Sequence, residues 1–486
     1  MGALAELLVM GRAVAAHRPC PRVVVEPAVW RLAAERLAEG VCTLLSLWGE
    51  PGQVNMALLE GRAVGVVSLA CPEGRYPSVG ALHAPALRLE RALRDLYGIE
   101  PVGLPDARPW LDHGAEPTAY PFLPVEGEAL HQIPVGPVHA GIIEPGHFRF
   151  TCDGETVVRL EQRLGYVHKG VDALMQGSTL ERAAKLAGRV SGDSTVAYAI
   201  AFARAVEAAL EVEPPARAVM LRAVMAELER VANHLGDVGA ICNDASFSLM
   251  LAHCGVLRER VLRAANACFG HRLMMDCVVP GGVASDLTAA GVGVLRRLVT
   301  ELRARFAPLV ALYDNTASLQ DRTVTTGTVR AALVGRFGAG GYVGRASGRE
   351  FDCRRVPGYA PYDSLAFSVP TRTEGDVNAR VWIRIEEIKQ SLSLIEQCLE
   401  HLSEGEIAVP LTPRGPVEGM ALAEAFRGDV LAWLRIDADG TIARCHLRDA
   451  SWFQWPLLEA AIEGNIVADF PLCNKSFNCS YSGHDL

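Results

Sequence analysis

The feature that most limits the fold of this chain is a proline-rich stretch between residues 105 and 137. It holds seven prolines, and each one fixes its own φ and biases the residue before it away from the helical conformation. Such a stretch cannot lie inside a helix or in a central strand. It predicts an extended linker over residues 116–137 that separates a domain of residues 1–115 from one of residues 138–486.

The residues before the linker carry both helical and strand patterns. Segments 28–39 and 85–97 have the apolar period of amphipathic helices, and Gly98 follows the second as a stop signal. Segments 41–47 and 64–69 are short apolar runs typical of strands. These patterns predict a small α/β domain.

The residues after the linker begin with a hairpin pattern and continue with long helices. The alternation around Asp153-Gly154 predicts two strands joined by a tight turn. A Gly-, Arg- and Pro-rich segment at 335–374 interrupts the helices and is long enough to serve a function or wrap a partner. The predicted class is α+β, with the small α/β domain followed by a large, mainly helical domain that has a short β-hairpin region. The helical segments are 179–185, 194–211, 216–240, 249–269, 285–312 and 378–402.

Charge and hydropathy argue against nucleic acid and membrane-spanning roles. The chain has 47 Lys and Arg against 56 Asp and Glu, a formal charge of -9, so it presents no overall basic field for nucleic acid. The most apolar stretch, 195–210, carries Arg204 and Glu207 and therefore predicts a buried helix. The first residues lack a basic leader, so a cytoplasmic location is expected.

The cysteines predict neither disulfides nor a metal centre. The chain has 13 scattered cysteines, an odd number, and no Cys-x-x-Cys pair. Zinc and iron-sulfur sites usually take two thiolates from one short turn. Buried, reduced thiols are the expected state of these residues.

Several stretches resemble one family of redox proteins. HAPALRLERALRDLYGIEPVGLPDARPWL (83–111) resembles the signature of the 30-kDa-type subunit of complex I, and residues 135–174 resemble the opening of the 49-kDa-type subunit and of nickel-iron hydrogenase large subunits. The chain as a whole is similar to a fused 30-kDa plus 49-kDa subunit of the formate-hydrogenlyase type. Five further segments follow the 49-kDa-type subunit in the same order: 226–240, 271–283, 319–324, 344–348 and 379–397.

The resemblance implies a function and a setting. It implies an NADH:quinone oxidoreductase-like or hydrogenase-like subunit that takes electrons from an iron-sulfur cluster in a small neighbouring subunit and passes them to a quinone. It also implies ion-pumping membrane subunits as partners, a peripheral place on the cytoplasmic face of the inner membrane, and no cofactor bound by this chain. Dependence on NADH, and any NAD binding, would belong to the assembly, because no G-x-G-x-x-G loop follows a strand here.

The family's nickel-iron ligands are missing from this sequence. The resemblance places the first ligand pair at Ser191 and Ser194 and the second at Ser480 and Gly483, and a shift of one residue would place Cys479 at the first position of that second pair. A nickel-iron site needs soft thiolate ligands, and neither a serine hydroxyl nor glycine replaces them. We therefore expect no metal centre. An alternative role for the first segment is structural, with Asp193 or Ser194 capping the following helix.

The quinone pocket of the family is only partly present. It uses a tyrosine and a loop with two histidines; His139 matches the first histidine, whereas the second falls near Glu144 or Pro145, with His147 just beyond. No tyrosine stands in RVSGDS, and the nearest is Tyr198. His139 is the expected proton donor to a reduced quinone, or else a loop histidine bonded to backbone. The expected cavity residues are His139, His147, Arg189, Ser191, Ser194 and Ser480.

A further set of charged residues lies in an apolar helix. Glu227, Arg230 and His234 are spaced i, i+3 and i+7 and so share one face. They form either a structural ion pair or part of a proton or conformational relay. Arg380, Arg384 and Glu387 on the last long helix allow the same two interpretations.

Two other functions stay open. A catalytically empty scaffold that holds the small subunit against the membrane arm would also have lost the metal ligands. An active hydrogenase would contain stoichiometric nickel.

Overall fold

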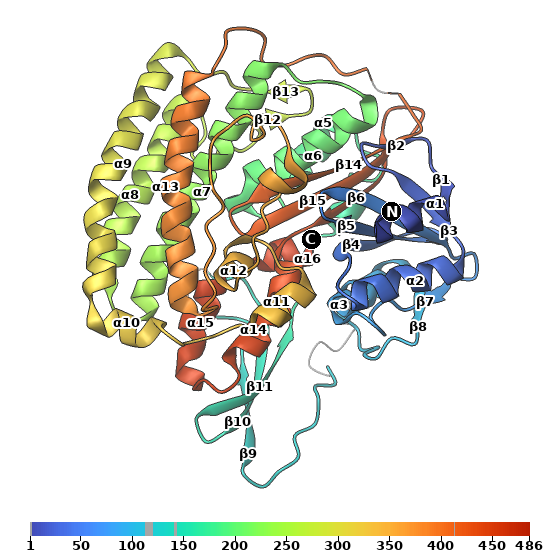
Figure 1. The fold of residues 1–486 in the computed structure, drawn as a ribbon, viewed down its shortest axis with the longest axis horizontal. Coiled ribbons are helices and arrows are strands. Elements are labelled where there is room, and N and C mark those ends of the chain that lie inside the picture. The colour runs from blue at the N-terminus through green and yellow to red at the C-terminus, as the bar shows by residue number, and fades with distance from the viewer. Residues whose placement is uncertain (1, 112–119, 140–142, 413) are drawn as a thin grey trace.

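The computed structural model describes residues 2–111, 120–139, 143–412 and 414–486. Its fold is α+β, as the sequence predicts. In Figure 1 the N-terminal α/β part (blue) lies on one side and a group of long helices (green, yellow and orange) on the other, with a C-terminal sheet (red) between them. Within the described residues no helix has the length and apolarity needed to cross a bilayer.

The N-terminal part is a five-stranded sheet in the order β1-β3-β6-β5-β4, covered by helices. The predicted helices and strands are present, and α3 ends at Gly98 with a φ of 65°, a left-handed conformation that glycine adopts without strain. Helix α1 and strands β1, β3, β5, β7 and β8 were not predicted from the sequence. The elements are α1 (Ala3–Val9), β1 (Arg12–Ala13), β3 (Arg22–Val25), α2 (Pro27–Ala38), β4 (Thr43–Glu50), β5 (Gln53–Glu60), β6 (Ala63–Ala70), β7 (Arg75–Pro77), α3 (Leu87–Tyr97) and β8 (Glu100–Val102).

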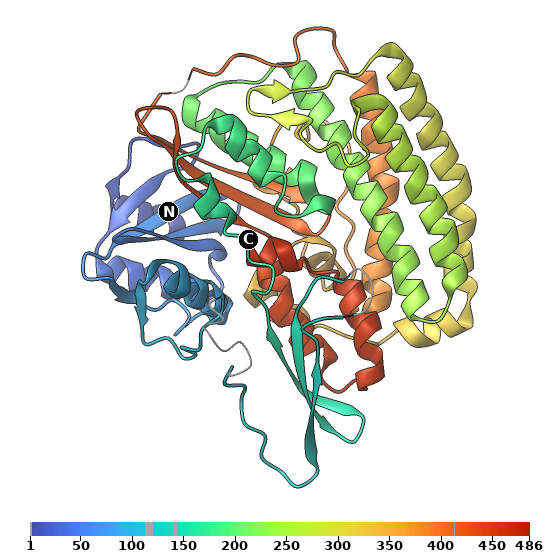
Figure 2. The same cartoon turned by 180° about the vertical axis from the view of Figure 1, so that it is seen from behind.

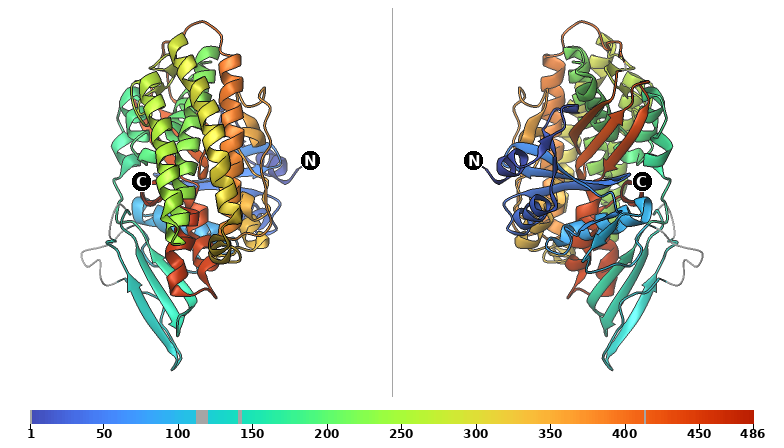
Figure 3. Two further views of the ribbon diagram at one scale, coloured as in Figure 1. Left: turned by 90° about the vertical axis from the view of Figure 1, so that its left-hand side faces the viewer. Right: turned by 90° about the vertical axis from the view of Figure 1, so that its right-hand side faces the viewer.

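The linker region differs from the expectation. Residues 130–135 form β9 (Leu130–Val135), which pairs with β10 (His147–Asp153), and β10 pairs in turn with β11 (Thr156–Arg163). Pro134 is tolerated because β9 is an edge strand of this three-stranded sheet. Residues 116–119 of the expected linker lie outside the described residues. The hairpin predicted at Asp153-Gly154 is confirmed, and the sheet extends away from the rest of the molecule (Figures 1 and 3).

The long helices are confirmed, with ends close to the predicted ones. Figure 3 shows α8, α9 and α13 as neighbouring, nearly parallel rods. The segment at 335–374 contains short helices as well as loops. The helices are α4 (Val171–Met175), α5 (Leu180–Ala187), α6 (Thr195–Leu210), α7 (Ala216–Asp244), α8 (Ser248–Phe269), α9 (Ala289–Asn315), α10 (Ala317–Thr323), α11 (Ala331–Phe337), α12 (Gly341–Ala346) and α13 (Val377–Glu400), with the short strands β12 (Val278–Val279) and β13 (Gly282–Val283) after α8.

The C-terminal sheet was not predicted from the sequence. Strands β14 (Val417–Ala425), β15 (Gly428–Ile436) and β16 (Ile442–Arg448) are buried along nearly their whole length, so they lack the alternating pattern of a half-exposed strand. Helix α6 packs against β14 and β15, and Figure 2 shows it crossing the sheet. The short strand β2 (His17–Arg18) pairs with β14 and so joins the N-terminal part to this sheet. The chain ends with α14 (Ser451–Ile462), α15 (Phe470–Phe477) and α16 (Tyr481–Asp485).

Candidate functional site

The four positions that the resemblance assigned to metal ligands come together in space. Ser191 precedes the short turn that leads into α6, and Ser480 is the residue before α16. The hydroxyl of Ser480 donates to the hydroxyl of Ser191 at 3.3 Å, and the backbone N–H of Gly483 donates to Ser480 Oγ at 2.8 Å. Two segments almost three hundred residues apart therefore meet at one point. We call Ser191, Ser194, Ser480 and Gly483 the serine cluster.

An ion pair lies beside the serine cluster. Arg427 donates to both carboxylate oxygens of Asp193 at 2.9 and 2.7 Å and to Ser194 Oγ at 3.3 Å. Ser191 Oγ also donates to Asp193 at 2.7 Å. Burial disfavours the charged carboxylate, but Arg427 and the two serine hydroxyls outweigh burial and lower the pKa of Asp193 to about 2. Asp193 is therefore ionised at neutral pH.

A tyrosine and a second carboxylate complete this region. Tyr198 Oη donates to Asp449 Oδ2 at 2.7 Å, and burial raises the pKa of Tyr198 well above its usual value. A Cβ atom added at Gly483 would lie 2.7 Å from Asp449 Oδ2, so a larger side chain there would require Asp449 to move. The sequence already indicated that Tyr198 would lie near Ser194. Tyr198 stands one helical turn after Ser194, so the two residues share one face of the helix.

The predicted cap of α6 is wrong. Neither Asp193 nor Ser194 bonds to the first backbone N–H groups of this helix. Glu229 of α7 does so instead, accepting from Val196 N at 2.7 Å and Ala197 N at 3.1 Å. Burial raises the pKa of Glu229 to about 8. A carboxylate from another helix thus replaces the local cap, and no local pattern in the sequence could show it.

The donor groups of the serine cluster do not suit a nickel-iron centre. They are three hydroxyls and a glycine, with the Asp193 carboxylate beside them, whereas such a centre takes four thiolates. The nearby Cys479 is only 5% exposed, and burial raises the pKa of its thiol. Within the described part of the chain, no three His, Cys, Asp or Glu side chains form a group that could hold a metal ion.

Arg189 does not take part in the cluster. Its side chain is 43% exposed and forms a two-pronged ion pair with Asp276, and it also bonds to the carbonyl of Lys185. The structure therefore does not bring the Arg189 guanidinium to the cavity position expected for it.

The two histidines hold the ends of one loop together. His139 Nε2–H donates to the carbonyl oxygen of Gly146 at 2.8 Å, and His147 Nδ1 lies 3.3 Å from the carbonyl oxygen of Gly136. Burial lowers the pKa of His147, so it is neutral at pH 7. The backbone bond of His139 is the one expected of a loop histidine, and it leaves Nδ1 as the nitrogen that could serve a ligand.

The histidine loop lies against the C-terminal segment that carries Ser480 and Gly483. Glu144 accepts from the backbone N–H of Ser482 at 3.0 Å. A Cβ atom added at Gly146 would lie 2.6 Å from the ring of Tyr481, so only glycine fits this contact. Residues 140–142 lie outside the described residues. The described ends of the loop are therefore next to the serine cluster.

The residues proposed as a relay belong to a buried charge network. Arg230 Nε donates to Glu227 at 3.3 Å, which is the ion pair of the structural interpretation. His234 Nε2 donates to Glu387 of α13 at 2.7 Å. Glu227 also accepts from Tyr362 and Ser391. The buried charge network comprises Glu227, Arg230, His234, Arg345, Asp352, Arg354, Glu387 and Glu424.

Arg345 is the centre of this network. It contacts Glu387 at 2.7 Å, Glu424 at 3.0 Å and Asp352 at 3.6 Å, and it is fully buried. The network has one carboxyl more than it has guanidinium groups, and burial raises the pKa of Glu424 to about 7. A proton on Glu424 would balance the charges. No local pattern indicates Asp352 or Arg354, which lie in the Gly-, Arg- and Pro-rich segment at 335–374, whereas Arg345 falls within the segment 344–348 that resembles the family.

Hydrogen bonds connect the serine cluster with α13. Arg427 donates to the carbonyl of Asn478, and Asn478 Nδ2 donates to Asp237 at 2.9 Å. Asp237 pairs with Arg384 at 3.1 Å. Glu387 stands one turn after Arg384 on the same helix. Arg380, in contrast, bonds to Ser476 and to backbone carbonyls.

The sequence matches known redox subunits. Residues 244–414 match the family described as the 49-kDa subunit of respiratory-chain NADH dehydrogenase. Formate hydrogenlyase subunit 5 of Escherichia coli K12 is 30% identical over 436 residues, which cover 84% of this chain and 77% of that protein.

Two further relatives are a hydrogenase and a subunit of an NADH-quinone oxidoreductase. A carbon monoxide-induced hydrogenase of Rhodospirillum rubrum is 31% identical, over 72% of this chain and 98% of its own length. An NADH-quinone oxidoreductase subunit of Sinorhizobium medicae is 33% identical, over 59% of this chain and 72% of its own length. These matches confirm the resemblance of the 49-kDa-type part, while the fused 30-kDa-type part stays a prediction.

Proposed function

Because this chain belongs to the family of the 49-kDa subunit of respiratory-chain NADH dehydrogenase and related hydrogenase subunits, we propose that it transfers electrons to a quinone without a nickel-iron centre. The donor would be an iron-sulfur cluster in a small neighbouring subunit, and ion-pumping membrane subunits would complete the assembly. The oxidoreductase role follows from the family; the donor, the acceptor and the partners are part of the proposal.

One observation supports the absence of nickel most directly. The four expected ligand positions do meet, but they bring together three hydroxyls and a glycine. The neighbouring charges, Asp193 and Arg427, satisfy each other. A metal that needs soft ligands gains nothing from these groups.

The same groups suit a quinone headgroup. A quinone carbonyl accepts hydrogen bonds, and Ser191, Ser480 and Tyr198 supply hydroxyl donors in this region. Reduction of a quinone to a quinol takes up two electrons and two protons. An imidazole can deliver a proton near neutral pH, and His139 lies on the loop that contacts the C-terminal segment.

A scaffold role is the second candidate, and one feature favours it. The serine cluster is filled by protein groups that already bond to each other, with Asp449 in the space beside Gly483. A quinone would have to displace some of these bonds. Quinone turnover separates the two functions, because a scaffold has none.

The test is quinone reduction by the complex purified from membranes, with His139→Ala. His131→Ala is the matched control, since His131 is an exposed histidine on β9. Loss of a general acid should lower turnover by roughly a hundredfold in the first variant and leave the second unchanged. Equal turnover of His139→Ala and the parent complex would remove His139 from the mechanism, and a complex with no quinone turnover at all would favour the scaffold.

A further inference from the structure

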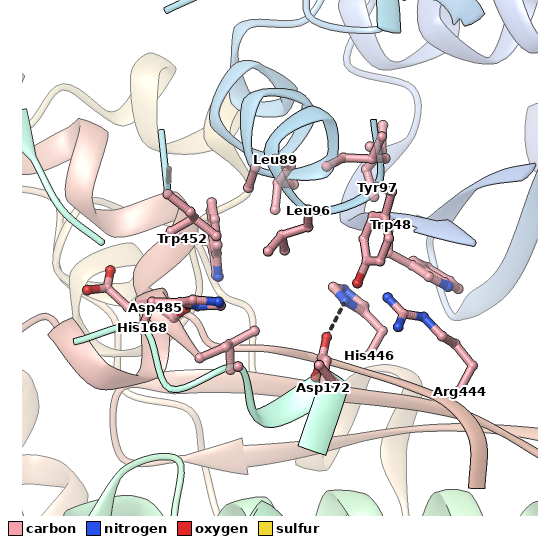
Figure 4. A pocket seen from close by; sticks show the side chains of 17 residues that line it. Trp48, Leu89, Leu96, Tyr97, His168, Asp172, Arg444, His446, Trp452 and Asp485 are labelled. Carbon is pink, nitrogen blue, oxygen red and sulfur yellow. Dashed lines mark hydrogen bonds and ion pairs between the residues drawn. The ribbon is translucent and has the colours of Figure 1, made fainter. Parts of the chain in front are cut away.

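A cavity of about 110 Å³ lies between the N-terminal part and the C-terminal sheet (Figure 4). One side is formed by α3 and β4, which contribute Leu89, Leu96, Tyr97 and Trp48. The other side is formed by α4, β16 and α14. The walls are mainly aliphatic and aromatic, which is typical of sites for small organic molecules. None of these residues belongs to the serine cluster or the buried charge network.

Arg444 is the unusual residue of this cavity. It is 7% exposed, and among the described residues its side chain makes no hydrogen bond and no ion pair. Its Nε–H is buried without an acceptor, and its guanidinium carbon lies 4.3 Å from the centre of the Tyr97 ring. Figure 4 shows the guanidinium extending from β16 toward the cavity. A buried N–H group normally has an acceptor, and the Nε–H of Arg444 has none among the described residues.

The adjacent strand provides a contrast. Arg435 of β15 stands directly opposite Arg444, and its guanidinium pairs with Glu50. The carboxylate of this pair comes from β4 of the N-terminal sheet, so that strand can supply an acidic partner to an arginine of β15. Within the described part of the chain, it supplies none to Arg444.

Among the other polar groups of the cavity, His446 and His168 have partners within the protein, whereas Asp172 Oδ1 and Trp48 Nε1 are buried without a hydrogen-bond partner. His446 contacts Ser46 Oγ at 2.7 Å and lies 3.7 Å from Asp172. Burial lowers the pKa of His446, so its ring is neutral at pH 7. His168 bonds to the carbonyl of Asp485 at 2.7 Å. Among the residues that the structure describes, Arg444 is thus the cation of this cavity whose guanidinium lacks a hydrogen-bond or ion-pair partner, while Asp172 and Asp485 are the acidic residues of the lining.

We propose that this cavity binds a small organic anion in which a carboxylate is attached to a single planar ring. A guanidinium matches the two oxygens of a carboxylate, and the ring would lie among Tyr97, Leu89 and Trp452. At about 110 Å³ the cavity is smaller than an engineered cavity of about 150 Å³ that takes benzene, so it would have to widen to hold a whole ring. Since both parts of the chain line the cavity, the ligand would bind across their junction. This proposal does not depend on the proposed electron transfer.

The experiment is calorimetric titration of the purified full-length chain with benzoate. We expect saturable binding of one benzoate per chain, with a dissociation constant on the order of 1 mM for so small a ligand. Arg444→Met should weaken binding by about tenfold or more, whereas Arg435→Met should not change it, because Arg435 already has a carboxylate partner. Ala173→Phe, at an exposed position lining the cavity, should also weaken binding without touching the core.

Two other ligands test the chemistry of the site. Benzamide has the same shape but no charge, so it should bind at least about tenfold more weakly than benzoate. Inorganic phosphate, which has charge but no ring, should bind more weakly too. The proposal is overturned if the binding of benzoate does not saturate. It is also overturned if Arg444→Met binds benzoate as tightly as the parent chain does, or if phosphate binds as tightly as benzoate.

Discussion

The serine cluster and the buried charge network are both buried polar regions, but they are built differently. The cluster is formed by loops and helix ends that are far apart in the sequence, and its members are mostly neutral hydroxyls. The network lies between long helices and the sheet, and most of its members carry full charges. Neutral hydroxyls can be replaced at small cost, whereas an unpaired buried charge is expensive. We infer that the network maintains the fold and that the cluster is the region free to change its chemistry.

The strongest test of this comparison is Arg345→Met. The change leaves Glu387, Glu424 and Asp352 without their shared cation, so the free energy of unfolding should fall by about 3–5 kcal/mol. Urea denaturation of the purified chain measures it. Arg303→Met is the matched control, because the pair of Arg303 with Glu396 is largely exposed and should contribute less than about 1 kcal/mol. Equal losses in the two variants would contradict a structural role for the network.

An effect of intermediate size on the free energy of unfolding is expected when the pH is varied. The pKa of Glu229 is raised to about 8 in the folded chain from an ordinary value of 4.5, so its contribution to stability is complete below about pH 4.5 and is lost as the pH rises toward 8. Glu229→Gln should therefore gain stability relative to the parent chain between pH 5 and pH 8, at most by about 1.4 kcal/mol per pH unit.

The control for this titration is an exposed carboxylate. This control is Glu35→Gln on α2, a position whose side chain is exposed. A difference between Glu229→Gln and the parent chain that is constant with pH would contradict the raised pKa.

The smallest loss of stability is expected for substitutions in the serine cluster. Ser480→Ala removes the acceptor of the Gly483 N–H and the bond to Ser191, which should cost about 1 kcal/mol. Ser191→Ala should lower the free energy of unfolding by no more than Ser480→Ala does, because Arg427 still pairs with Asp193. Thermal unfolding of both variants checks this. A loss as large as that of Arg345→Met would mean that the cluster, too, is structural.

The sequence predicted the parts of the fold that have a clear period. The long helices and the hairpin at Asp153-Gly154 were correct because apolar residues recur at helical or strand spacing. Strands β14–β16 were missed because both their faces are buried. Strand β9 was hidden by prolines that an edge strand accepts.

The site was predictable only in its outline. The resemblance located Ser191, Ser194, Ser480 and Gly483, and the structure brings them together. It could not show that Arg427 and Asp449 would complete the region, since both come from the unpredicted sheet or its end. The pairing of Arg189 with Asp276 likewise depends on tertiary contacts.

The most direct test of the central claim is the nickel content of the purified complex, measured by elemental analysis on the same sample that reduces quinone. We predict quinone turnover with nickel far below one atom per chain, because the serine cluster offers no thiolate. One nickel atom bound per chain in the active sample would contradict this account.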